Sequence, residues 1–192
     1  ELYSGDTNTS VGEAVPHQGF STFGFVVAFA RGLLGLEVDV PQQRILFAPH
    51  LPAHWDSLEL RNVRASENLY HFFLKREFGK LHLQVDGRGT KPFELFFSPA
   101  LPYGTVVKRI LLSGMEQSPH VLETGQDIHV PITISMSGSV ELVIEYNEGV
   151  EFSPSQNEIR LGDRSTGLRI ISVKGKEQLM TVEVEGIRGN TY

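Results

Sequence analysis

The feature that most constrains the fold is a series of short segments, from Val38 onward, in which apolar and polar residues alternate. In the segment KLHLQVD (80–86), Leu81, Leu83 and Val85 occupy every second position. A period of two is typical of a strand that buries one face. The other segments that we interpret as strands are 44–48, 58–63, 69–75, 93–97, 106–112, 128–134, 140–146, 168–173 and 180–185. About ten short strands, separated by Gly- and Pro-containing turns, predict a mainly β chain folded as an antiparallel β-sandwich.

A different pattern precedes the strands. Between Gly19 and Gly35 the apolar residues follow a three-and-four spacing, which predicts a helix that Gly32 and Gly35 loosen and end. Phe25, Val26 and Phe29 lie off that stripe, so the helix is apolar nearly all round, and such a helix is normally buried on all sides. We therefore expect it to come from a larger helical domain. In the chain alone it should pack on the β-domain or self-associate through residues Phe20–Leu36.

This change of pattern predicts two parts. Residues 1–37 would be the terminal loop and helix of a helical-barrel catalytic domain, and residues 38–192 a C-terminal β-sandwich domain. The chain begins with Glu1 rather than Met, so we expect it to be a fragment.

Composition excludes several classes of function. The net charge is −6 and there is no basic stripe, so nucleic acid is not an expected partner. There is no cysteine, which removes disulfides and thiolate metal sites. The longest apolar run, Phe23–Ala30, is far shorter than the roughly 20 residues of a membrane span. We therefore expect a soluble protein that does not bind a membrane.

One acidic residue stands in a Gly- and Pro-punctuated loop just before the predicted helix. Glu13 precedes the segment AVPHQGFS (14–21), and a loop held by a buried helix can aim a carboxylate at the mouth of a barrel. Glycosidic bonds are cut by two carboxyl groups, and Glu13 would supply one of them. His17 and Gln18 could hydrogen-bond sugar hydroxyls, and Phe20 could shape the wall of the site. On composition alone, a loop glutamate is more often a solvated surface residue.

Three segments in order carry a resemblance to a known family. Residues 13–21, RGLLGLE (31–37) and LFAPHLPAHW (46–55) together resemble the C-terminal part of bacterial six-hairpin glycosidases, in particular the amylo-alpha-1,6-glucosidase (glycogen-debranching-like) group. The resemblance covers roughly residues 1–112. It implies an (α/α)6 barrel that carries the active site, a small β-sandwich behind it, and a bacterial cytoplasmic or periplasmic location.

The resemblance also implies roles for residues. In the related trehalases a base glutamate lies seven residues before the aromatic that opens a barrel helix, and Glu13 and Phe20 have this spacing. Glu13 is thus implied as the general base, with His17, Gln18 and Phe20 as substrate-binding residues. The general acid of such enzymes lies on an earlier barrel loop, so this chain alone is expected to be inactive and to need the N-terminal catalytic barrel as its partner. No cofactor is implied.

Other interpretations remain open. The chain could be a carbohydrate-binding or structural β-sandwich module without catalysis, with Tyr70, Phe72, Phe73 and Phe96–Phe97 as a platform that stacks on sugars. His50 and His54 are four residues apart, which suggests a metal site. Pro49 and Pro52 exclude a regular helix there and no third ligand is nearby in the sequence, so no metal is expected. The segment would instead be a rigid connection, with Trp55 as a packing anchor.

Overall fold

The computed structural model describes residues 19–89, 91–147, 149–153, 167–176 and 179–192, and they are mainly β-structure. Helix α1 covers Gly19–Val27 and continues as a π-helical segment, η1, over Ala28–Leu33. The strands are β1 (Leu36–Asp39), β2 (Arg44–Phe47), β3 (Ser57–Ala65), β4 (Asn68–Glu77), β5 (Lys80–Arg88), β6 (Phe93–Phe97), β7 (Ala100–Pro102), β8 (Val107–Leu112), β9 (Met115–Gln117), β10 (Leu122–Glu123), β11 (Asp127–His129), β12 (Ile132–Met136), β13 (Val140–Tyr146), β14 (Arg169–Lys176) and β15 (Leu179–Glu185).

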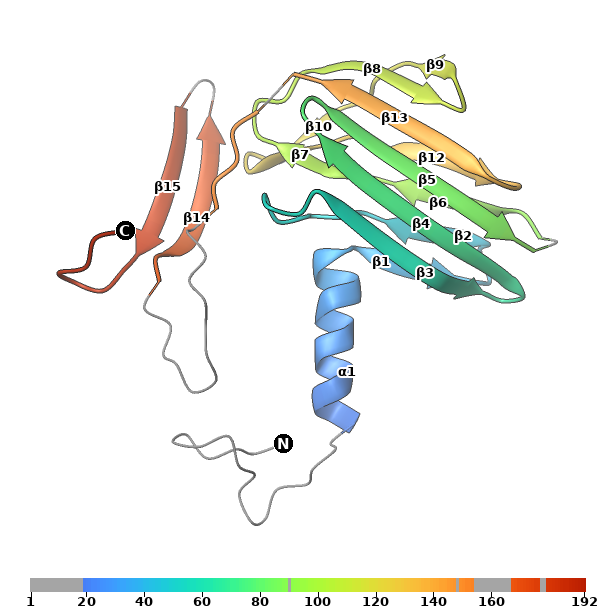
Figure 1. Cartoon of the computed structure of the whole chain (residues 1–192), viewed down its shortest axis with the longest axis horizontal. Helices are drawn as coiled ribbons and strands as arrows, with labels where there is room; N and C mark the ends of the chain where they lie inside the picture. The colour runs from blue at the N-terminus through green and yellow to red at the C-terminus, as the bar shows by residue number, and fades with distance from the viewer. Residues whose placement is uncertain (1–18, 90, 148, 154–166, 177–178) are drawn as a thin grey trace, which may run out of the picture. The chain divides into compact units, whose positions relative to one another are not determined.

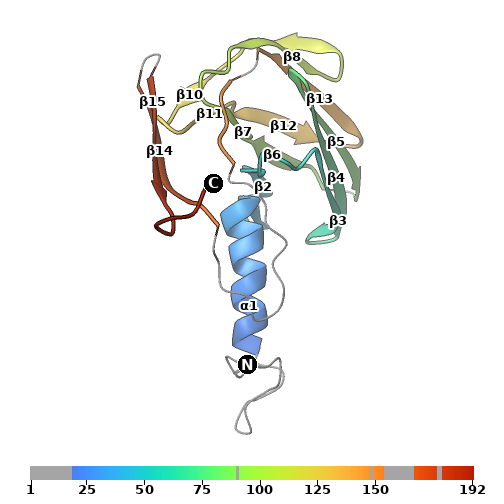
Figure 2. The same cartoon turned by 60° about the vertical axis from the view of Figure 1, so that its left-hand side comes forward.

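Two sheets form the layers of a sandwich, as predicted. One sheet has six strands in the order β3-β4-β5-β13-β8-β9, all antiparallel. The other has four strands in the order β1-β2-β6-β12, in which only β2 and β6 run parallel. In Figure 1, β3, β4 and β5 of the six-stranded sheet are teal to green and β13 is orange, whereas β1 and β2 of the four-stranded sheet are blue; Figure 2 shows the six-stranded sheet nearly edge on.

The hydrophobic core lies between these layers because the strands alternate as their sequences predict. Leu81, Leu83 and Val85 of β5 are all buried, at 4%, 1% and 0% exposure. Across the layers, the ring of Phe47 lies 5.5 Å from that of Phe72, centroid to centroid. Apolar faces that meet in this way supply most of the driving force for folding.

A third sheet, of β10, β11 and β7, is small and differs from the prediction. We expected one strand over 128–134, but the structure has two, β11 and β12, which belong to different sheets. Pro131 lies between them and has no backbone N–H to continue a ladder. Its place in the sequence explains why the chain changes sheets there.

The helical segment leads into the first strand through a glycine. Gly35 has φ +54°, and a Cβ there would lie 2.6 Å from the carbonyl oxygen of Ala48. Only glycine fits such a position. The next residues enter β1, so the predicted end of the helix near Gly35 is confirmed, although its last turn is π-helical.

The chain divides into two compact units. The larger is Leu33–Phe152 and contains β1–β13 and the whole core cluster. The described residues of 19–32 and 153–192 belong to the other, which holds α1 and the β14–β15 hairpin. The expected domains, 1–37 and 38–192, stay a prediction. Among the described residues, no helix combines the length and apolarity needed to cross a membrane.

Candidate functional site

The site predicted from the sequence lies mostly outside the described residues. Glu13, His17 and Gln18 precede residue 19, where the described part of the chain begins. Phe20 lies in α1, one residue after the helix begins. The catalytic role of Glu13 and the substrate contacts of His17, Gln18 and Phe20 therefore stay predictions.

The aromatic platform does not form. Tyr70, Phe72 and Phe97 are buried in the core, each with at most 3% of its surface exposed. Phe73 and Phe96 are half-buried, but they lie on strands of different sheets, β4 and β6. The guanidinium of Arg44 covers the ring of Phe96, 5.4 Å from its centroid. The rings cannot make one stacking surface, because most of them face inward to the core.

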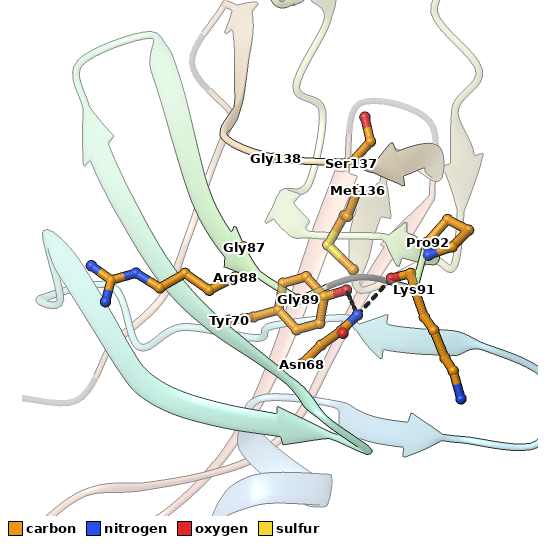
Figure 3. A pocket seen from close by; sticks show the side chains of 10 residues that line it. All are labelled: Asn68, Tyr70, Gly87, Arg88, Gly89, Lys91, Pro92, Met136, Ser137 and Gly138. Atoms are coloured by element: carbon orange, nitrogen blue, oxygen red, sulfur yellow. Dashed lines mark hydrogen bonds between the residues drawn. The ribbon is translucent and has the colours of Figure 1, made fainter.

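A small pocket lies where β4, β5 and the turn before β13 meet (Figure 3). The Asn68 side-chain nitrogen donates hydrogen bonds to the Tyr70 hydroxyl, at 2.9 Å, and to the carbonyl oxygen of Lys91, at 2.6 Å. The side-chain oxygen of Asn68 is buried and has no hydrogen-bond partner among the described residues. A Cβ at Gly89 would lie 1.9 Å from that oxygen, so glycine keeps room for it. At ≈ 170 Å³ the pocket is smaller than a typical ligand site.

A larger groove is lined by the middle of β3, the start of β4 and the end of β5. Its volume is ≈ 510 Å³, which is within the range of ligand sites. Arg61 donates two hydrogen bonds of 2.8 Å to the Glu59 carboxylate, which also contacts Nε2 of His71 at 2.8 Å. The bonds from Arg61, helped by His71, lower the pKa of the Glu59 carboxyl. The groove thus presents a fixed anionic group whose charge is already balanced by its neighbours.

A third group joins residues that are far apart in the sequence. Asp127 and His129 alternate along β11, so their side chains lie on one face, while Ile128 between them is 2% exposed. His50 approaches from the loop after β2. The Asp127 carboxylate lies 3.2 Å from Nε2 of His50 and 3.3 Å from Nε2 of His129. The two imidazole rings meet edge to face, with centroids 5.0 Å apart.

Backbone hydrogen bonds explain why His50 reaches this strand. The amide of Ala100 donates to the carbonyl oxygen of Pro49 at 3.0 Å, and Ala100 is paired with His129 in the β7–β11 ladder. The amide of His50 donates to the carbonyl oxygen of Leu33 at 2.9 Å. The bond between Ala100 and Pro49 therefore holds the loop after β2, and with it His50, beside β7 and β11.

Sequence reasoning found one member of this group and missed two. His54, which we paired with His50, is exposed and meets the ring of Trp55 at 6.4 Å instead. The Asp-x-His spacing at 127–129 could have indicated two ligands on one strand face. Nothing in the sequence connects that strand to His50, because the contact depends on the order of strands in the third sheet.

The Pro-rich segment is tied to β4. The Arg76 side chain donates to the carbonyl oxygens of Pro52, at 2.8 Å, and Ala53, at 2.6 Å, and Arg76 also pairs with Glu151 at 3.3 Å. These contacts fix the segment after His50 against the six-stranded sheet, in agreement with the predicted rigid connection. Trp55 is half-buried.

Comparisons with known proteins do not show a family. No family model matches the chain, and no curated protein matches it. Among solved structures, an alpha-L-rhamnosidase from Dictyoglumus thermophilum is similar to this chain at 17% sequence identity and a TM-score of 0.40. The match covers 64% of this chain and 14% of that protein, so this chain corresponds to a small part of it. We therefore conclude nothing about the function of this chain from a similarity with this TM-score.

Proposed function

We propose that the chain is the C-terminal part of a glycoside hydrolase that acts on alpha-glucosidic or related sugar linkages. In this proposal the sandwich unit braces a helical catalytic barrel, and α1 belongs to that barrel. The finer proposal, from the resemblance of residues 13–55 to six-hairpin glycosidases, is an enzyme of the amylo-alpha-1,6-glucosidase group.

The observation that supports the proposal most is the apolar surface of α1 and η1. Phe23, Phe25 and Val26 are 68%, 73% and 53% exposed, and Phe29 is 36% exposed. Each large apolar side chain left in water forgoes about 1.5–3 kcal/mol of burial free energy. A helix that is apolar on several sides is stable as a packed member of a helical assembly, and an (α/α)6 barrel is such an assembly.

The proposed chemistry uses residues just before this helix. Glu13 would take a proton from the attacking water as the general base, while His17, Gln18 and Phe20 contact the sugar. An acid on another loop of the barrel would protonate the leaving oxygen. Both carboxyl groups are needed, so residues 1–192 alone should not hydrolyse glycosides.

The test compares the protein as it is encoded, including whatever precedes Glu1, with its Glu13→Gln variant on a panel of aryl glycosides. Loss of a general base should lower kcat by about 10²–10⁴-fold without a change in the far-ultraviolet circular dichroism spectrum. Asp6→Asn removes another carboxylate from the same terminal segment and is the matched control, which should keep full activity.

Near-normal turnover of Glu13→Gln would remove Glu13 from the proposed active site. Enzyme-like hydrolysis by residues 1–192 alone would contradict the need for a partner barrel. If the encoded protein bound soluble glucans but hydrolysed none, the proposal would fail in favour of a carbohydrate-binding module.

A further inference from the structure

The three side chains on and beside β11 have the composition of a metal site. His50, Asp127 and His129 each offer one ligand atom, and these atoms all lie within 4.8 Å of one another. In the part of the chain that the structure describes, this is the one group of three or more such residues that meets this condition. Two imidazole nitrogens and one carboxylate oxygen are a donor set that zinc and neighbouring divalent transition metals prefer.

The distances agree with coordination. Ligands at about 2.0–2.1 Å from a tetrahedral zinc ion lie about 3.3 Å from one another. The carboxylate oxygens of Asp127 are 3.2 Å from Nε2 of His50 and 3.3 Å from Nε2 of His129. Nε2 of His50 faces Oδ2 of Asp127 and Nε2 of His129 faces Oδ1. Each imidazole therefore lies from the carboxylate at the spacing of two ligands on one ion, and the three ligand atoms lie within 4.8 Å of one another.

The surroundings hold the ligands in the orientation that binding requires. Nδ1 of His129 lies 3.4 Å from the carbonyl oxygen of Ser98, to which it can donate a proton and so leave Nε2 free as a ligand. Metal-bound histidines characteristically make such a second hydrogen bond. The Thr124 hydroxyl donates to the Asp127 carboxylate across the β10–β11 turn and fixes the third ligand.

Accessibility also fits an ion that enters from solvent. The side chains of Asp127 and His129 are 21% and 16% exposed, whereas that of His50 is 48% exposed. His50 lies on a loop at the open side, where a fourth ligand could be water. We propose that His50, Asp127 and His129 form a binding site for a divalent transition metal ion, with zinc as the ion of choice.

Isothermal titration of the metal-free 192-residue chain with zinc chloride tests the site. One zinc ion should bind per chain, and His50→Ala or His129→Ala should weaken binding by at least about tenfold. Thr124→Val keeps all three ligands but removes the bond to Asp127, and it should weaken binding by a smaller factor. Cobalt(II) should give the intense visible absorption of a tetrahedral site with nitrogen and oxygen ligands.

His71→Ala is the matched control, because His71 also contacts a carboxylate, that of Glu59, but no third ligand joins them among the residues that the structure describes. It should leave zinc affinity unchanged. His50 is exposed, so His50→Ala should keep the melting temperature of the metal-free protein, which shows that lost binding is not lost folding. No binding by the native chain, or equal affinity in His50→Ala and His71→Ala, would overturn the proposal.

Discussion

Tyr70 is a buried, titratable residue that makes the stability of the sandwich depend on pH. Its ring is 3% exposed and lies 6.2 Å from that of Phe93 in the opposite layer. Burial raises the pKa of its hydroxyl, and the hydrogen bond from Asn68 opposes part of that shift. The folded protein therefore holds the proton of Tyr70 more tightly than the unfolded chain does.

This shift has a consequence for stability at alkaline pH. Below the ordinary tyrosine pKa, near 10, both states keep the proton and the contribution of Tyr70 is complete. Above that value the unfolded chain ionises while the folded protein keeps its proton. Stability therefore falls until the pH has risen through the higher pKa of the folded state. Tyr70→Phe should lose less stability than the native protein between pH 9 and 12, by up to about 1.4 kcal/mol per pH unit.

Urea unfolding at a series of pH values measures this difference. Tyr192→Phe, at a tyrosine that is 49% exposed, is the control for removing a phenol without removing a buried one. Parallel stability curves for the native protein and Tyr70→Phe would show that Tyr70 does not titrate differently in the two states.

The burial of some residues could be predicted from the sequence, whereas the grouping of others into a site could not. The alternation of Leu81, Leu83 and Val85 alone predicts that they share one buried face, and all three are buried, because burial in a strand follows its local period. The meeting of His50 with Asp127 and His129 could not be predicted, because it depends on which strand lies beside which. The predicted roles of Glu13, His17, Gln18 and Phe20 are untested.

At the scale of elements, α1 and η1 combine a regular helix with unusual exposure. Phe25 and Phe29 stack on each other with centroids 6.3 Å apart and planes inclined by 13°. This pair leaves aromatic surface in contact with water, although such surface is favourably buried. Without a partner barrel, the helix should bury it against a second copy of the chain.

Phe25→Ser tests this self-association. It should raise the dissociation constant of any dimer by at least about tenfold, since each buried phenylalanine contributes about 1.5–3 kcal/mol. Sedimentation equilibrium measures the constant. Phe78→Ser is the control, because Phe78 is 89% exposed in the β4–β5 turn, away from this helix in sequence. Equal effects of the two variants would count against association through Phe20–Leu36.

Strand boundaries were predictable where turns carry a local signal. The segment 93–97 coincides with β6, and 44–48 differs from β2 by one residue. The strands that were missed, β1, β7, β9 and β10, have two to four residues each. So few residues show no period, and these strands form because neighbouring strands offer hydrogen-bonding edges.

At the scale of the molecule, the core belongs to one unit. Every member of the buried core cluster lies between Leu34 and Tyr146, within the unit Leu33–Phe152. A domain of this size can bury enough apolar surface to fold alone. We expect residues 33–152, expressed separately, to keep a β-type circular dichroism spectrum and to unfold in one cooperative transition in urea.

Leu95→Ala in the same fragment provides the comparison. Leu95 is fully buried, so its truncation should cost about 2–5 kcal/mol and shift the urea midpoint accordingly. If fragment 33–152 had no cooperative transition, or if Leu95→Ala did not change its urea midpoint, its core would not fold independently of the rest of the chain.

The parallel pairing of β2 with β6 sets an order of events during refolding. Arg44 pairs with Glu94, and the chain between them makes the β3–β4–β5 meander in the opposite layer before it returns. The meander closes only short loops and can form early, whereas β2 and β6 must wait for a long loop to close. The rate-limiting step should therefore be the completion of the four-stranded sheet. Until that step is complete, the apolar inner face of the meander is exposed to solvent and can aggregate.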